Sequence, residues 1–139
     1  MTPEQQVLVQ TSFAKVAPVA DSVATLFYDD LFQRNRRLRS LFKDDMTEQR
    51  KMLMSMLGTA VANLHDWNRV AGALRALGAR HVSYGVATAD YDTVGAVLIA
   101  TLEKALGDDF TPETRDAWVT CYTAIVGEML GATTDGTPA

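Results

Sequence analysis

The stretch Leu74-Arg-Ala-Leu-Gly-Ala-Arg-His81 is the most informative part of this 139-residue chain. Leu74 and Leu77 lie seven and four positions before His81, and these spacings place all three side chains on one face of a predicted helix. An imidazole on an apolar helix face needs an explanation. It can be a core histidine that hydrogen-bonds a backbone carbonyl, or a ligand to a bound group. The spacing alone leaves both interpretations open.

The first half of the chain contains three residues that form a pattern with this histidine: Tyr28, Phe42 and Gln49. An aromatic pair, an amide and a lone histidine on helical segments are what a haem pocket needs. One imidazole binds the iron, and polar groups on the opposite face hold a diatomic ligand. The other histidine, His65, falls at a predicted break beside Asp66, where an exposed loop histidine is expected.

Apolar residues recur at helical spacing along the chain, and no segment shows the sustained alternation of a strand. Helix starts are predicted at Thr2-Pro3-Glu4-Gln5, a capping box, near Asp45 or Thr47, and at Thr111-Pro112-Glu113. The predicted helices and helical turns cover about residues 3–17, 21–33, 36–42, 47–64, 70–84, 91–106 and 112–132. We therefore predict an all-α domain over residues 1–132, followed by a flexible C-terminal tail over residues 133–139.

Composition narrows the class of protein. The 47% hydrophobic content excludes a disordered chain, and a net charge of -4 argues against binding to nucleic acid. A short basic cluster is flanked by aspartates, so we interpret it as a solvated surface; it comprises Arg34, Arg36, Arg37 and Arg39. No apolar run is long enough to span a bilayer, and the N-terminal residues lack the pattern of a signal peptide, so we expect no membrane association and a cytoplasmic location.

Other chemistries find little support in the sequence. Two histidines and one remote cysteine, Cys121, do not make a zinc site, and Cys121 falls in an apolar pattern typical of a buried, inert thiol. The chain has no nucleophile elbow, dinucleotide-binding motif or phosphate-binding loop. Three alternating methionines, Met52, Met54 and Met56, can line an apolar pocket or fill the core.

Five stretches match one family in order and spacing. They are LFYDDLF (26–32), RSLF (39–42), GARHVSYGV (78–86), YDTVG (91–95) and AWVTCY (117–122). Through them the chain resembles the globins, and specifically the bacterial single-domain globins related to the haemoglobin domain of flavohaemoglobins. The resemblance implies a globin fold, a three-over-three helical sandwich around haem b. The short interval between Phe42 and Gln49 leaves no room for a separate D helix, as is typical of this group.

The resemblance also implies roles for single residues. His81 matches the proximal iron ligand, Phe42 the aromatic that stacks on the haem, and Tyr28 and Gln49 the distal residues that stabilise a bound ligand. Further haem contacts are implied for Leu53, Val86, Tyr91 and Val94. Two basic residues, Lys51 and Arg80, can pair with the haem propionates or remain solvated charges.

The sequence departs from the flavohaemoglobins in two respects. No flavin or nicotinamide reductase domain is expected, because the sequence stops at Ala139. Their globin domains also carry a late glutamate that, with a tyrosine, hydrogen-bonds toward the proximal histidine. Here Tyr91 is present, but the matching position is Thr133, and Glu128 lies a turn or more too early. Strong electron donation from the proximal side is therefore not expected.

These features leave several functions open. The first is reversible binding of O2, and of CO and NO, with bound O2 stabilised by hydrogen bonds from Tyr28 and Gln49. The second is an NO dioxygenase, which would need a separate reductase as partner. A haem-based gas sensor ranks third because no output domain is apparent. A purely structural helical bundle would leave His81, Tyr28 and Gln49 without a joint explanation.

Overall fold

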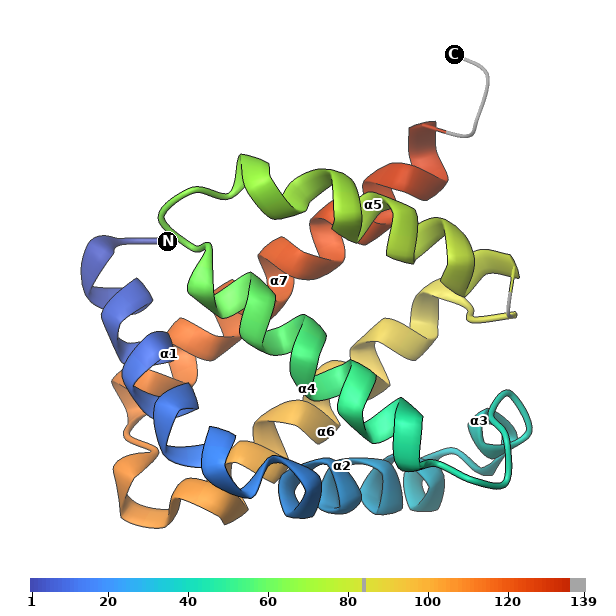
Figure 1. Cartoon of the computed structure of the whole chain (residues 1–139), viewed down its shortest axis with the longest axis horizontal. Helices are drawn as coiled ribbons and strands as arrows, with labels where there is room; N and C mark the ends of the chain where they lie inside the picture. The colour runs from blue at the N-terminus through green and yellow to red at the C-terminus, as the bar shows by residue number, and fades with distance from the viewer. Residues whose placement is uncertain (84, 136–139) are drawn as a thin grey trace.

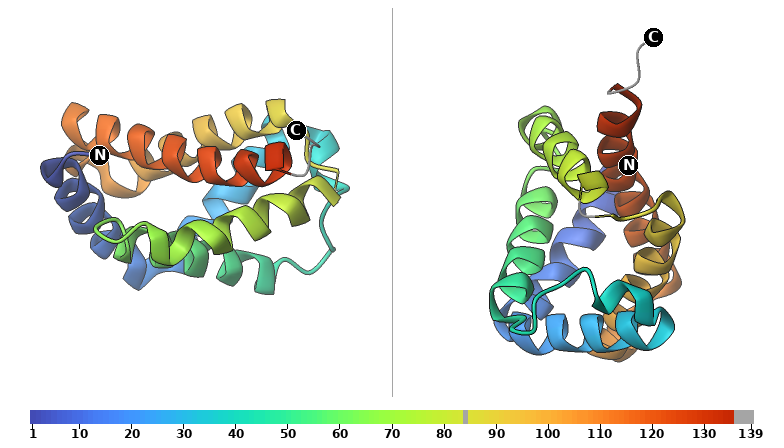
Figure 2. Two further views of the ribbon diagram at one scale, coloured as in Figure 1. Left: turned by 90° about the horizontal axis from the view of Figure 1, so that it is seen from above. Right: turned by 90° about the vertical axis from the view of Figure 1, so that its right-hand side faces the viewer.

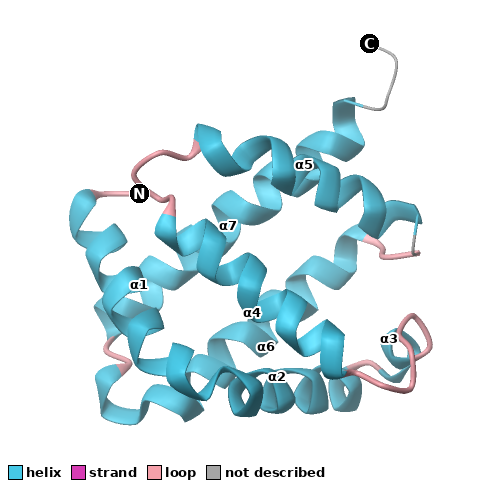
Figure 3. Cartoon of the chain, viewed as in Figure 1, coloured by secondary structure: helices cyan, strands magenta, loops and turns pink. Residues whose placement is uncertain are grey.

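Helices make up the architecture, as the spacing of the apolar residues predicts. The computed structural model describes residues 1–83 and 85–135, and within these ranges it contains helices and turns but no strand. The elements are α1 (Pro3–Val16), η1 (Ala17–Val19), α2 (Ala20–Arg34), α3 (Arg36–Arg39), α4 (Thr47–Ala62), α5 (Asn68–Ser83), α6 (Thr88–Leu106), η2 (Gly107–Asp109) and α7 (Pro112–Asp135) (Figures 1 and 3).

The long helices form the predicted three-over-three sandwich. One layer contains α1, α4 and α5, and the other contains α2, α6 and α7 (Figure 2). Between the layers, α5 and α1 pack on α7, and α2 packs on α4. The apolar residues that recur at helical spacing meet in the space between these layers, where they form one continuous core.

Local chemistry accounts for several helix ends. The predicted capping box is confirmed: the Gln5 backbone N–H donates to Thr2 Oγ1 at 3.1 Å, and the Thr2 N–H donates to Gln5 Oε1 at 3.0 Å. At the start of α4 the Thr47 N–H donates to Asp45 Oδ1 at 3.0 Å. Gly85 lies in the turn after α5 with φ of +89°, a conformation that favours glycine because a Cβ would be strained there.

The connection from α3 to α4 fits the expected absence of a D helix. Residues 40–46, all of which the structure describes, form turns and bends but no helix. At the other end of the chain, α7 continues through Asp135, into the segment predicted to be a tail. Residues 136–139 of that predicted tail lie outside the described residues, and the domain boundary at residue 132 stays a prediction.

Two contacts fix α7 against the rest of the molecule. Trp118 is fully buried, and its indole N–H donates to the Ser12 hydroxyl at 2.8 Å, which ties α7 to α1. Gly78 brings α5 against α7 so closely that a Cβ built at this position would lie 2.1 Å from the Met129 carbonyl oxygen. The two backbones therefore meet with no side chain between them, and only glycine fits.

None of the helices within the described ranges has the length and apolar character needed to cross a membrane.

Candidate functional site

A cavity of about 660 Å³ lies between the two helical layers. Most of the residues that line it are aliphatic or aromatic, and they come from the helices α2 to α7, from the connection after α3 and from the segment before α6. All the site residues predicted from the sequence line this one cavity: Tyr28, Phe42, Gln49, Lys51, Leu53, Arg80, His81, Val86, Tyr91 and Val94. The structure thus brings together residues that are up to 66 positions apart in the chain.

Sequence reasoning missed much of the apolar lining. Leu57, Leu98 and Ile125 are buried residues of three different helices, and each faces the cavity. Their helical spacing predicts core positions, but spacing alone does not separate a residue that faces a cavity from one that faces another side chain. The methionines divide between the two interpretations, because Met52 and Met56 line this cavity whereas Met54 lines a much smaller neighbouring one.

The His81 ring has one nitrogen committed and one available. Its Nδ1 lies 2.8 Å from the Leu77 carbonyl oxygen, and since a carbonyl can only accept, Nδ1–H must be the donor. In the neutral ring Nε2 is then an acceptor that can bind a metal. Burial lowers the pKa of His81 below its usual value, although the bond to Leu77 acts in the opposite direction. The two interpretations of this histidine are compatible: it bonds a backbone carbonyl and still offers Nε2.

Tyr91 on α6 packs beside this imidazole. The two rings are stacked with an interplanar angle of 27° and centroids 6.4 Å apart. The Tyr91 backbone is itself held, because its carbonyl oxygen accepts a hydrogen bond of 2.6 Å from the Tyr122 hydroxyl of α7. The orientation of His81 is therefore limited by its own helix through Leu77 and by α6 through Tyr91.

A second polar pair lines the cavity from α2 and α4. The Gln49 amide Nε2 donates to the Tyr28 hydroxyl oxygen at 3.0 Å. Because the amide fills one acceptor position of that oxygen, the single hydroxyl proton of Tyr28 remains available to another group. Burial raises the pKa of Tyr28, with the bond from Gln49 opposing it, so the phenol keeps its proton at neutral pH.

Aromatic rings hold Tyr28 in place. Phe27 and Phe42 contact it edge to face, with centroids 5.0 and 5.6 Å away, and Phe32 lies 5.8 Å from it. Such pairs favour these tilted and edge-on geometries. Phe42 itself belongs to the connection after α3, so the position of that connection bears directly on this part of the cavity.

Comparison with known proteins identifies the family. The globin family model matches residues 25–129. The chain belongs to the globin family. Its similarity to a bacterial globin structure from Campylobacter jejuni confirms the globin fold, with a TM-score of 0.86 at 20% identity over 96% of this chain and 97% of that one.

Curated relatives of this globin include two named flavohemoprotein. The protein from Bacillus subtilis is 27% identical over 118 residues, and the one from Deinococcus radiodurans is 25% identical over 134 residues. These matches cover 83% and 94% of this chain but only 30% and 33% of the relatives. The chain thus spans about a third of the length of the curated relatives it matches.

The cavity of this globin fits a haem group. Its volume lies within the range of about 300–1,000 Å³ found for cofactor pockets, and its lining is mostly apolar. It offers one metal-binding imidazole nitrogen at His81, whereas the described residues contain no cluster of three or more His, Cys, Asp or Glu that could hold a bare metal ion. A macrocycle that carries its own four nitrogen ligands needs only one such protein ligand.

The structure also places the remaining polar residues that the sequence singled out. His65 is exposed, as expected for a loop histidine, and Cys121 is fully buried, where burial raises the pKa of its thiol to about 12. Lys51 and Arg80 are exposed residues at the edge of the cavity.

The structure also shows the contacts that Glu128 makes. Its carboxylate accepts hydrogen bonds from Trp67 Nε1 at 3.3 Å and from Arg75 Nε at 3.0 Å. These partners lie before and within α5, so Glu128 ties α7 to the first half of that helix. The expectation that it lies too early to serve His81 agrees with these contacts, and the side chain of Thr133 lies outside the described part of the chain.

Proposed function

We propose that this globin holds haem b through His81 and reversibly binds O2, and also CO and NO. The observation that carries the proposal is that His81 on α5 and Tyr28 on α2 line one apolar cavity, with His81 Nδ1 bonded to the Leu77 carbonyl and the Tyr28 hydroxyl bonded to Gln49. When bound, haem supplies the iron at which a diatomic ligand coordinates. We further propose that Lys51 and Arg80 pair with its propionates at the cavity edge.

His81 is suited to be the protein ligand because its hydrogen bond fixes both the tautomer and the ring direction. Nδ1–H donates to the Leu77 carbonyl, so the proton cannot occupy Nε2 in the neutral ring. A backbone carbonyl is a weaker acceptor than a carboxylate, so this histidine keeps the character of a neutral imidazole. That character favours reversible ligand binding over chemistry that needs strong electron donation.

The Tyr28 hydroxyl is the donor that acts directly on a ligand. Gln49 occupies one acceptor position of the phenol oxygen, and this leaves the phenol proton for a ligand in the cavity. A hydrogen bond to a polarised ligand in a dry site is worth about 1–3 kcal/mol, or roughly 5- to 150-fold in the dissociation rate. CO is less polarised than O2 and gains less from the same bond.

NO dioxygenase activity with a separate reductase is the second candidate. It is favoured by the similarity to the two relatives named flavohemoprotein, and the same Tyr28 and Gln49 pair serves it. Against it, Glu128 is paired with Trp67 and Arg75, so it is not available to strengthen the proximal histidine. We also propose the cytoplasm as the place where the protein acts.

Absorption spectroscopy of the purified protein tests the proposal. Spectra are recorded for the oxidised protein, after reduction under argon, and after exposure to air. A Soret band with a stable O2-liganded spectrum in air supports reversible binding. Rapid return to the oxidised form, together with consumption of added NO in the presence of a reductant, favours the dioxygenase. Absence of a Soret band after addition of hemin contradicts the haem proposal itself.

A further inference from the structure

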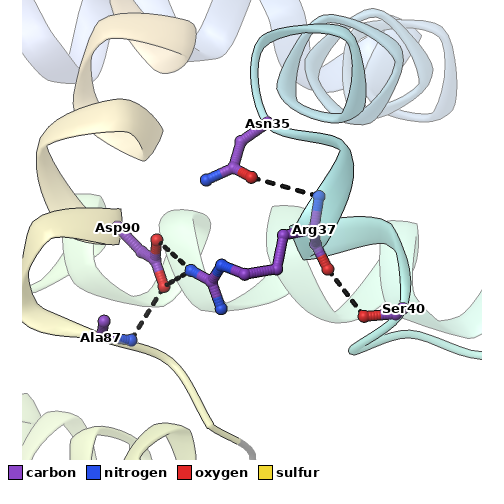
Figure 4. Close-up of polar contacts among 5 residues, drawn as sticks. All are labelled: Asn35, Arg37, Ser40, Ala87 and Asp90. Atoms are coloured by element: carbon purple, nitrogen blue, oxygen red, sulfur yellow. Dashed lines mark hydrogen bonds and ion pairs between the residues drawn. The ribbon is translucent and has the colours of Figure 1, made fainter.

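Arg37 and Asp90 form an ion pair beside the haem cavity that the basic composition of the 34–39 segment conceals. Arg37 Nη2 donates to both carboxylate oxygens of Asp90, at 2.6 and 2.7 Å (Figure 4). The arginine is half exposed, with 51% of its side chain accessible, whereas the aspartate side chain is only 6% accessible. The prediction that this segment is simply a solvated surface is therefore incomplete, because one of its arginines crosses to another helix.

Asp90 also orders the start of α6. Its Oδ2 accepts a hydrogen bond of 2.8 Å from the Ala87 backbone N–H, and this bond caps the helix. With this cap, α6 begins at Thr88 and not at the predicted Tyr91. Burial opposes ionisation of Asp90, but the bonds from Arg37 and Ala87 and the arginine charge together hold its pKa below the usual range. The carboxylate is thus charged and fully engaged at neutral pH.

Arg39, two residues later, has a different role. Its guanidinium donates to the carbonyls of Phe42, Lys43 and Asp44 and so stabilises the connection from α3 to α4. Arg37 instead joins α3 to the start of α6. Figure 4 shows Arg37 extending from α3 across to the start of α6.

The pair joins two sides of the same cavity. On one side, α3 leads into Phe42, which lines the cavity and contacts Tyr28. On the other side, Asp90 lines the cavity and precedes Tyr91, whose ring stacks on His81. A change in the distance between α3 and α6 would therefore alter the distal and the proximal contacts together.

We propose that Arg37 and Asp90 are positioning residues that close the cavity around haem and set the rate at which haem is lost. The inference rests on the proposed haem function, since it concerns retention of that group. A charge-assisted hydrogen bond, here from one guanidinium nitrogen to both oxygens of a buried carboxylate, is among the stronger polar contacts in proteins. When this pair breaks, the connection after α3 that carries Phe42 and the start of α6 can move apart. This movement opens the route by which haem leaves.

The test measures transfer of haem from the oxidised protein to an excess of a haem-scavenging apoprotein. Arg37→Met removes the charge and the donors but keeps an unbranched apolar stem, and Asp90→Asn removes the charge but keeps an acceptor for the Ala87 cap. We expect each variant to lose haem about tenfold faster than the parent, a magnitude typical of a strong charge-assisted bond. We expect the double variant to lose haem no faster than either single variant, and Arg37→Lys to restore part of the retention.

A matched control separates this role from general destabilisation. Lys15 of α1 pairs with Asp109 of η2 at 3.3 Å, and neither residue lines the cavity. Lys15→Met should leave haem loss unchanged. The free energy of unfolding of each apoprotein, measured in urea, shows whether haem loss follows stability or exceeds it.

Three results would overturn the proposal. The first is wild-type haem loss in Arg37→Met. The second is faster loss in Arg37→Met but not in Asp90→Asn, because the arginine would then act on the haem itself. The third is faster loss in proportion to the fall in unfolding free energy, with Lys15→Met following the same proportion. Failure of the parent protein to bind hemin at all would instead refute the proposed function.

Discussion

Replacement of Tyr28 by phenylalanine should accelerate O2 dissociation far more than CO dissociation. The substitution removes only the hydroxyl and keeps the ring, whose contacts with Phe27 and Phe42 do not involve the oxygen. One hydrogen bond of about 1–3 kcal/mol is lost to the ligand, which predicts a roughly 5- to 150-fold faster O2 dissociation. For CO, which carries less charge on its outer atom, the change should be at most a few-fold.

The Gln49 amide affects how much faster O2 dissociates from Tyr28→Phe within that range. It donates to the Tyr28 oxygen at 3.0 Å, and loss of that oxygen leaves the amide N–H without this acceptor. The freed amide can then donate to the ligand and replace part of the lost stabilisation. We therefore expect Tyr28→Phe/Gln49→Leu to release O2 faster than Tyr28→Phe alone, while Gln49→Leu alone has the smallest effect.

Stopped-flow measurement of O2 displacement by CO, and of CO displacement by NO, provides both rates on the same preparations. Equal acceleration of O2 and CO release in Tyr28→Phe would refute the hydrogen-bond argument and indicate a change of pocket shape. A larger effect of Gln49→Leu than of Tyr28→Phe would show that the amide, and not the phenol, is the direct donor.

Three further predictions follow from the proximal side and the helix contacts. His81→Gly should abolish stable haem binding, and added imidazole should restore the Soret band if the cavity itself remains intact. Gly78→Ala should lower the free energy of unfolding, measured in urea, by about 1–3 kcal/mol because its methyl group would overlap the α7 backbone. The control is Gly72→Ala, whose Cβ would meet no atom of another element within 4 Å; it should leave stability unchanged or raise it by up to about 1 kcal/mol. The pKa of Asp90 is lowered in the folded state, so its contribution to stability is fully present above its unfolded pKa of about 3.9. This contribution is lost as the pH falls through the folded-state pKa. The difference in unfolding free energy between the parent and Arg37→Met should therefore shrink in that acidic range.

The fold could be predicted from sequence because its signals are local. Apolar spacing within each segment and the capping box at Thr2 act over a few positions, and the structure follows them. The start of α4 was placed correctly, but neither Asp45 nor Thr47 is its N-cap: that position is Met46, and Asp45 accepts the Thr47 N–H just before the helix. The residues of the candidate site could be predicted as well, because most of them fall in stretches matched to the family; Gln49, Lys51 and Leu53 lie between two of these stretches and follow from their positions after Phe42.

What the sequence did not reveal depends on pairs that are distant along the chain. Arg37 lies among four arginines, and nothing in its neighbourhood distinguishes it from the others until α6 brings Asp90 to it, 53 positions later. Gly78 is similar, because a glycine inside a helix lowers helix propensity and makes sense only beside Met129. A single sequence contains these residues but not the information on which pairs meet.

The close approach at Gly78 has a mechanical consequence. Contacts through side chains can absorb small displacements by rotation about their bonds, whereas two backbones in direct contact have no such compliance. The segment that carries His81 therefore cannot slide along α7 without moving it. A shift of the imidazole toward or away from a bound group would displace α7 as well. Binding inside the cavity would therefore change the position of a helix on its outside.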